Sequence, residues 1–104
     1  MSVVEHSDVP HLVLSGEIDV ASAADLRQAG NRALDSLGVG ARLDIDMTAV
    51  TFIDSSGFGA LVSIRKAADV AGHDGVLRIS TPSIVRLFEL MGLHESFIIL
   101  TEPR

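Results

Sequence analysis

Residues Thr51–Gly59 read T-F-I-D-S-S-G-F-G, and this stretch marks the point where a strand gives way to the central helix of the chain. The apolar pair Phe52-Ile53 meets three consecutive capping residues, Asp54-Ser55-Ser56, after which a helical pattern runs without interruption to Ala71. Asp and Ser are favoured helix N-caps because their side-chain oxygens accept a hydrogen bond from a free backbone N–H group one turn into the helix. Three such residues leave at least one serine hydroxyl outside the cap. Because a helix N-terminus favours an added anion, that serine is a position where a phosphoryl group could be carried.

Two further stretches, 42–47 and 76–80, alternate strictly between apolar and polar residues. The strands of a doubly wound parallel sheet are covered on both faces and read as continuously apolar, whereas a strand with one polar face needs a cover on one side only. The alternation therefore predicts an α/β fold of two layers, a mixed four- to five-stranded sheet with helices packed mainly on one face. The apolar positions are Leu43, Ile45, Met47, Leu77 and Ile79, and the polar positions on the uncovered face are Asp44, Asp46 and Arg78.

The same patterns outline the remaining elements. Strands are also expected over 2–8, 12–16 and 97–100, and helices over 22–37, 56–71 and 81–91, each helix closed by a glycine. Ser22 with Asp25 resembles a capping box, and Thr81 is expected to cap a helix that has Pro82 at its first position. The chain has no repeats or linkers, so residues 1–104 are interpreted as one domain.

Composition narrows the class of partner. The chain has 104 residues, no cysteine, no apolar stretch long enough for a membrane span and no signal peptide, so a cytoplasmic protein is expected. The formal net charge is −6 and the basic residues are scattered. Nucleic acid and anionic membranes are therefore disfavoured as partners, and a basic protein surface is favoured.

Three aspartates raise the question of a metal site. Asp19, Asp46 and Asp54 each lie at or near the end of an expected strand, and the ends of parallel strands share one rim of the sheet. Carboxylates grouped in this way can hold Mg²⁺, as in a phosphoacceptor receiver domain. Such a domain also needs a lysine after a later strand, and residues 79–82 offer none. We therefore expect Asp54 and Asp19 to cap turns and helices and Asp46 to be a solvated strand residue, with no metal bound.

Other patterns for catalysis or cofactor binding are weak. The four histidines lack metal-ligand spacing and are expected to be solvated. Gly57 and Gly59 belong to no nucleotide-binding loop, so they are expected to allow close approach of the first helical turn to a neighbour. An S-x-x-K match at residues 63–66 lacks the companion motifs of that enzyme class. No enzyme activity and no cofactor are predicted.

The two serines remain open on residue types alone. Ser55 and Ser56 are both suited to helix capping, and one of them is expected to cap. The other is then exposed and available for modification. Which serine has which role is not decided by the residues themselves.

Several segments together resemble one family. The motif D-S-S-G-F-G at Asp54–Gly59, preceded by L-D-I-D at Leu43–Asp46, is similar to the signature of the STAS domain, in particular that of bacterial anti-sigma factor antagonists. G-E-I-D at Gly16–Asp19 resembles the segment before the first helix of that family. R-L-F-E-L-M-G-L at Arg86–Leu93 resembles its late helix and the following turn. These matches cover almost the whole chain at the expected spacing.

The resemblance implies a cytoplasmic switch protein. In its unmodified form it would bind an anti-sigma factor that is also a serine kinase, and thereby free a sigma factor. The kinase would use ATP to phosphorylate Ser55, the serine directly after the motif aspartate, with Ser56 as the alternative acceptor. A metal-dependent serine phosphatase of the PP2C type would restore the binding form. The expected partner-binding residues are Asp19, Ser22, Asp54, Ser55, Ser56, Gly57 and Phe58.

Two departures from the family pattern accompany the resemblance. Phe58 stands where leucine is more usual, and the sequence ends at Arg104, where many members continue into a further helix. An alternative function is that of a STAS docking or scaffold subunit in a transport or stress-sensing complex, without a phosphorylation cycle. A serine at position 55 favours the switch, because docking alone does not require a hydroxyl group there.

Overall fold

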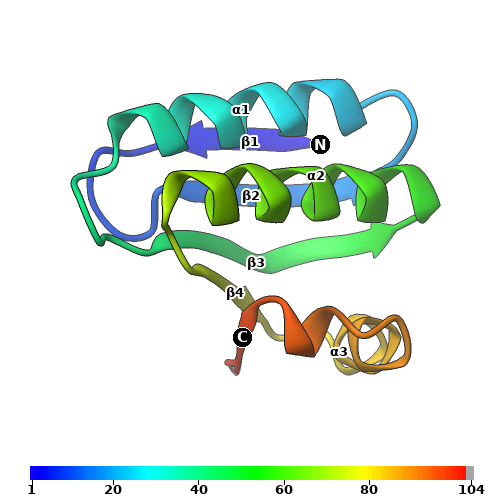
Figure 1. Ribbon diagram of the computed structural model, residues 1–104. Helices are drawn as coiled ribbons and strands as arrows, with labels where there is room; N and C mark the ends of the chain where they lie inside the picture. The colour runs from blue at the N-terminus through cyan, green and yellow to red at the C-terminus, as the bar shows by residue number, and fades with distance from the viewer. Residues whose placement is uncertain (103–104) are drawn as a thin grey trace.

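A computed structural model describes residues 1–102. One five-stranded sheet forms the base of the molecule (Figure 1). The strands lie side by side in chain order; β1 is antiparallel to β2, and every other neighbouring pair is parallel. This confirms the mixed sheet expected from the sequence. The strands are β1 (Ser2–Glu5), β2 (Leu12–Ile18), β3 (Leu43–Ile53), β4 (Gly75–Ile79) and β5 (Ile98–Thr101).

Three helices cover one face of this sheet. They are α1 (Ala23–Ser36), α2 (Ser55–Ala71) and α3 (Pro82–Leu90), and the short 3-10 helix η1 (Leu93–Glu95) follows α3. Each α-helix connects two adjacent parallel strands, and right-handed crossovers that all step in one direction place their helices on the same face. The twist of the sheet rotates α3 away from the direction of α1 and α2 (Figure 1).

Helix α2 is the central helix of this layer, as its apolar sequence predicts. It lies next to α1, and its approach is close at Gly30, where an added Cβ atom would lie 2.5 Å from Cγ1 of Ile64. On its other side Phe58 meets Phe88 of α3 edge to face, with the ring centroids 4.7 Å apart. The core between the helices and the sheet includes the fully buried Leu12, Leu14, Ile45, Leu77 and Ile79.

The uncovered face of the sheet carries an ion-pair network that strand alternation does not reveal. Asp44 is only 4% exposed, because the guanidinium group of Arg78 donates one hydrogen bond to each oxygen of its carboxylate, at 2.8 Å and 2.8 Å. Arg78 also donates to Glu102, beyond the end of β5. Both carboxylates raise the pKa of Arg78 above its ordinary value. The network ties β3, β4 and the end of β5 together across the polar face.

Several boundaries differ from those expected. The first strand ends at Glu5 rather than at residue 8, β2 continues to Ile18, and β5 begins one residue later than expected. The strand predicted over 42–47 extends to Ile53, so Asp46 lies in mid-strand, where its carboxylate accepts hydrogen bonds from the backbone and hydroxyl of Thr48. Asp46 is therefore not part of a rim of strand ends.

The expectation that all four histidines are solvated was wrong for two of them. His11 and His73 are each 7% exposed. Nδ1 of His11 accepts a hydrogen bond from the backbone N–H group of Asp44, and Nδ1 of His73 lies 2.7 Å from the carbonyl oxygen of Ala41. Both histidines therefore join loops to backbone that is distant in sequence.

Candidate functional site at the start of helix α2

The N-terminus of α2 is capped by Asp54. This residue has extended backbone dihedrals, and its Oδ1 accepts a hydrogen bond of 3.0 Å from the N–H group of Gly57. The cap expected at Asp54 is thus confirmed, whereas the expectation that Ser55 or Ser56 caps the helix was wrong: the aspartate comes first in the chain and already has the backbone geometry that a cap requires. Ser55 is exposed and Ser56 is half-buried. The cap leaves both hydroxyl groups unused.

The ends of β2 and β3 bring two of the three sequence-predicted aspartates together. Ile18 and Ile53 are register partners in the parallel pair, and the next residues are Asp19 and Asp54. The N–H group of Asp54 donates a 3.1 Å hydrogen bond to the carbonyl oxygen of Ile18, which continues the ladder to the first residue before α2. Asp19 and Asp54 thus share the rim, as the sequence predicts.

The loop between β2 and α1 is held by Asp19 and Ser22. Oγ of Ser22 accepts a 2.9 Å hydrogen bond from the N–H group of Asp19, and Oδ1 of Asp19 accepts one of 3.1 Å from Ala21. Ser22 occupies the N-cap position of α1 but forms no side-chain cap bond, so the predicted capping box with Asp25 is not formed. Ser22 is 8% exposed, and it therefore shapes the loop more than it contributes surface.

Gly57 and Phe58 lie beneath the serines rather than beside them. A Cβ atom added at Gly57 would lie 2.7 Å from Cγ2 of Ile18, 2.7 Å from Cγ1 of Ile53 and 3.0 Å from the carbonyl oxygen of Ile18. Phe58 is 6% exposed because its ring packs on α3. Both were expected to contact a partner directly. Because they are buried, they instead pack the first turn of α2 against neighbouring elements of the fold. The close approach predicted at Gly57 is confirmed.

Two surface positions were missed or misread from the sequence. Val20, in the loop beside Asp19, is an apolar residue that is 76% exposed. Gly59 is exposed, and no atom lies within 4 Å of a Cβ atom added there, so its expected close approach to a neighbour was wrong. Gly59 lies one helical turn after Ser55 and shares its face. The sequence could have placed Gly59 on this surface, because it follows Ser55 by four residues in a predicted helix.

We call the resulting patch the α2 N-terminal surface; its members are Asp19, Val20, Asp54, Ser55, Ser56 and Gly59. Its electrostatic character is mixed, because two carboxylates lie beside the partial positive charge of the helix N-terminus. Within residues 1–102, no three His, Asp or Glu side chains are grouped so that they could hold a metal ion. Nor is any helix in that range long and apolar enough to cross a bilayer. The surface therefore presents the exposed hydroxyl group of Ser55 on a helix turn that is packed tightly against the strand ends.

The site is thus the start of a helix that is capped by Asp54, carries two serines in its first turn and begins at the ends of parallel strands of a mixed sheet. A family model described as "Mlab, STAS domain" matches residues 1–101, and the chain belongs to this family.

Named relatives with similar sequences are bacterial. The chain is 30% identical over 94 residues to an anti-sigma-B factor antagonist of Listeria monocytogenes, covering 88% of this chain and 81% of the relative. It is 33% identical over 82 residues to the anti-sigma-B factor antagonist of Bacillus subtilis, covering 79% and 72%.

Solved structures agree in fold. An anti-sigma factor antagonist from Mycobacterium paratuberculosis superposes with a TM-score of 0.79 at 25% identity, covering 97% of this chain and 86% of the other. The anti-sigma factor antagonist SpoIIAA in its unphosphorylated form gives a TM-score of 0.67 at 17% identity, over 86% and 83% of the two chains. This second likeness is one of fold alone.

Proposed function

We propose that the chain is an anti-sigma factor antagonist that is switched by phosphorylation of Ser55. Its unphosphorylated form binds an anti-sigma factor that is also a serine kinase, and a sigma factor is thereby released. Phosphorylation by that kinase ends the interaction, and a PP2C-type phosphatase restores it. The protein acts in the cytoplasm as a binding partner and not as an enzyme.

One observation carries this proposal: Asp54, and not a serine, caps α2. Ser55 is consequently exposed at the first position of the helix, with its hydroxyl group outside the cap. A kinase needs an accessible hydroxyl group, and a docking partner needs a fixed surface. The α2 N-terminal surface supplies both, because Gly57 seats the first turn tightly against Ile18 and Ile53.

The phosphate would act on the partner rather than on the fold. It adds roughly −1.5 to −2 charges at neutral pH, which the helix N-terminus favours by about 0.3–1 kcal/mol. The neighbouring carboxylates of Asp19 and Asp54 oppose that gain by like-charge repulsion. At a docked interface the phosphate group would be buried without a partner, at a cost of more than about 1.4 kcal/mol, which is tenfold in affinity.

The test is phosphorylation by the cognate kinase with ATP, followed by mass spectrometry and a binding measurement. We expect one phosphate on Ser55, none on the Ser55→Ala variant, and a loss of kinase binding of at least about tenfold. Ser56→Ala is the matched control and should still be modified. Phosphate on any residue other than 55 or 56 would refute the switch, and equal binding by both forms would favour a docking subunit without a cycle.

A further inference from the structure

Strand β5 is an unguarded edge of the sheet. No strand within residues 1–102 pairs with its outer side. Natural edge strands usually carry charged residues, proline or a bulge that discourages further pairing. The opposite edge, β1, ends in Glu5, whose carboxylate is paired with Arg32 of α1. The sequence of β5 is Ile98-Ile99-Leu100-Thr101, which contains none of these devices, and the first charged residue is Glu102, which follows the strand and is paired with Arg78. This edge is free to accept another strand.

The backbone groups that β5 offers can be assigned. The N–H group of Glu102 donates a 2.8 Å hydrogen bond to the carbonyl oxygen of Ile79 in β4. Successive residues of a strand direct their backbone groups to opposite sides, so Leu100 also faces β4. The N–H and carbonyl groups of Ile99 and Thr101 therefore point outward, toward the free edge.

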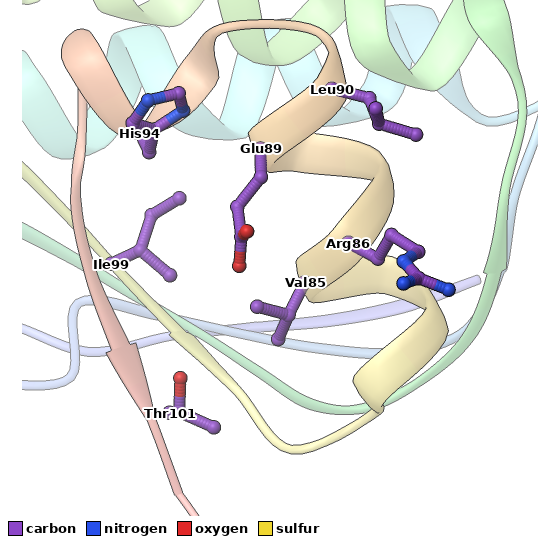
Figure 2. A pocket seen from close by; sticks show the side chains of 7 residues that line it. All are labelled: Val85, Arg86, Glu89, Leu90, His94, Ile99 and Thr101. Carbon is purple, nitrogen blue, oxygen red and sulfur yellow. The ribbon is translucent and has the colours of Figure 1, made fainter.

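The side chains of the same two residues line a groove between β5 and α3. The groove has a volume of about 560 Å³, and its lining includes one carboxylate, that of Glu89, and one guanidinium group, that of Arg86. Figure 2 shows Glu89 projecting from α3 into the space between this helix and β5, while Arg86 and Leu90 project from the other side of the helix. No ion pair within residues 1–102 involves Glu89. The lining residues are Val85, Arg86, Glu89, Leu90, His94, Ile99 and Thr101.

We propose that β5 and this groove bind an extended, basic segment of a partner protein by strand addition. Main-chain hydrogen bonds to Ile99 and Thr101 would provide the binding, and every second side chain of the added strand would enter the groove. A lysine or arginine at such a position meets Glu89, and the formal net charge of −6 steers basic segments toward the chain. The surface lies at the edge of the sheet, two strands from β3, and it is independent of the switch proposed for Ser55.

The probe for this proposal is the peptide acetyl-Thr-Val-Lys-Val-Thr-amide, with glutamate in place of lysine as its counterpart. Titration of the ¹⁵N-labelled protein to peptide concentrations of ~1 mM detects binding with dissociation constants up to the millimolar range. We expect the amide signals of Ile99 and Thr101 to shift with the lysine peptide. Glu89→Gln should weaken its binding about threefold, the effect of losing one exposed ion pair. Asp35→Asn removes the same charge from exposed α1 surface and should change nothing.

A second variant tests hydrogen bonding at the free edge of β5 without disturbing the fold. Thr101→Pro removes an outward N–H group but no hydrogen bond to β4, and proline is tolerated on edge strands. It should abolish peptide binding while the melting temperature stays unchanged. Unshifted β5 signals, equal binding of both peptides, or full binding by Thr101→Pro would each overturn the proposal. Self-association of the protein that Thr101→Pro abolishes would assign the edge to a second copy, and would overturn it as well.

Discussion

Two glycines in the first turns of α2 should respond to the same substitution in opposite directions. Gly57→Ala places a methyl group 2.7 Å from two isoleucine side-chain atoms and 3.0 Å from the carbonyl oxygen of Ile18. The side chains can shift, but the carbonyl group is fixed by its hydrogen bond to Asp54. Gly59→Ala places the same methyl group in open space.

The magnitudes follow from two opposing effects. Replacing glycine by alanine in a helix stabilises by about 0.5–1 kcal/mol. Overpacking of a tight site costs about 1–3 kcal/mol, and the backbone contact at Gly57 places it in the upper part of that range. We therefore expect Gly57→Ala to lower the free energy of unfolding by about 1–2 kcal/mol. Gly59→Ala should raise it by about 0.5–1 kcal/mol.

Urea denaturation followed by circular dichroism measures the free energy of unfolding of each variant against that of the unsubstituted protein. For a domain of this size, 1 kcal/mol corresponds to a shift in melting temperature of about 4–8 °C. The partner-binding measurement adds a second readout, since Gly59→Ala puts a methyl group on the α2 N-terminal surface. It should weaken binding although it stabilises the fold. If both alanines shift stability in the same direction, the account of how α2 is seated on the strand ends is wrong.

Four further substitutions, at three positions, test polar contacts of the sheet, of the α2 cap and of the pair between β1 and α1. Arg78→Met leaves Asp44 buried without its partner and should destabilise by about 2–3 kcal/mol in thermal or urea unfolding, somewhat less than for a fully buried pair because Arg78 is partly exposed; an unchanged midpoint would contradict the buried network. Asp54→Ala removes the cap of α2 and should cost about 1 kcal/mol, whereas Asp54→Asn keeps an acceptor and should cost less. The hydrogen bonds from Arg32 lower the pKa of Glu5 below its ordinary value of 4.5, so their contribution to stability is present above that pH and is lost as the pH falls through the lowered pKa. Glu5→Gln should therefore have its small effect at neutral pH and none in strong acid, as pH-dependent melting curves would reveal.

The layer architecture was predictable because alternation is a local signal. The alternating apolar residues Leu43, Ile45 and Leu77 predict a sheet face covered by helices, and all three are fully buried. The burial and the hydrogen-bond partners of the polar residues were not predictable in the same way. Asp44 is buried because Arg78, 34 residues later, reaches across from β4, and His11 is buried because its ring meets a backbone group 33 residues away. Such pairings depend on strand register, which alternation within one strand does not specify.

The start of α2 was predicted in place, but the hydrogen bonds around it were not predicted in detail. Three successive residues that favour the N-cap position predicted the start of α2, but N-cap propensity alone does not decide which of them caps the helix. The choice is made by the extended backbone of Asp54, which continues from β3. That continuity was hidden because β3 is longer than its alternating segment. Its pairing with β2 includes shifts of register between Val13 and Ser15 and between Gly16 and Glu17, which break the period on which the prediction depends.

The same hydrogen bonds determine what a phosphate on Ser55 would find. An α-helix begins with four N–H groups that lack partners within the helix. In α2 that of Asp54 donates to Ile18 and that of Gly57 donates to the Asp54 carboxylate, which leaves those of Ser55 and Ser56. Those two groups would favour a phosphate by only about 0.3–1 kcal/mol, and the neighbouring carboxylate of Asp54 would oppose that gain, so we expect the phosphate to alter the surface more than the fold. A switch built in this way changes the surface that a partner meets while the sheet and helices beneath it stay in place.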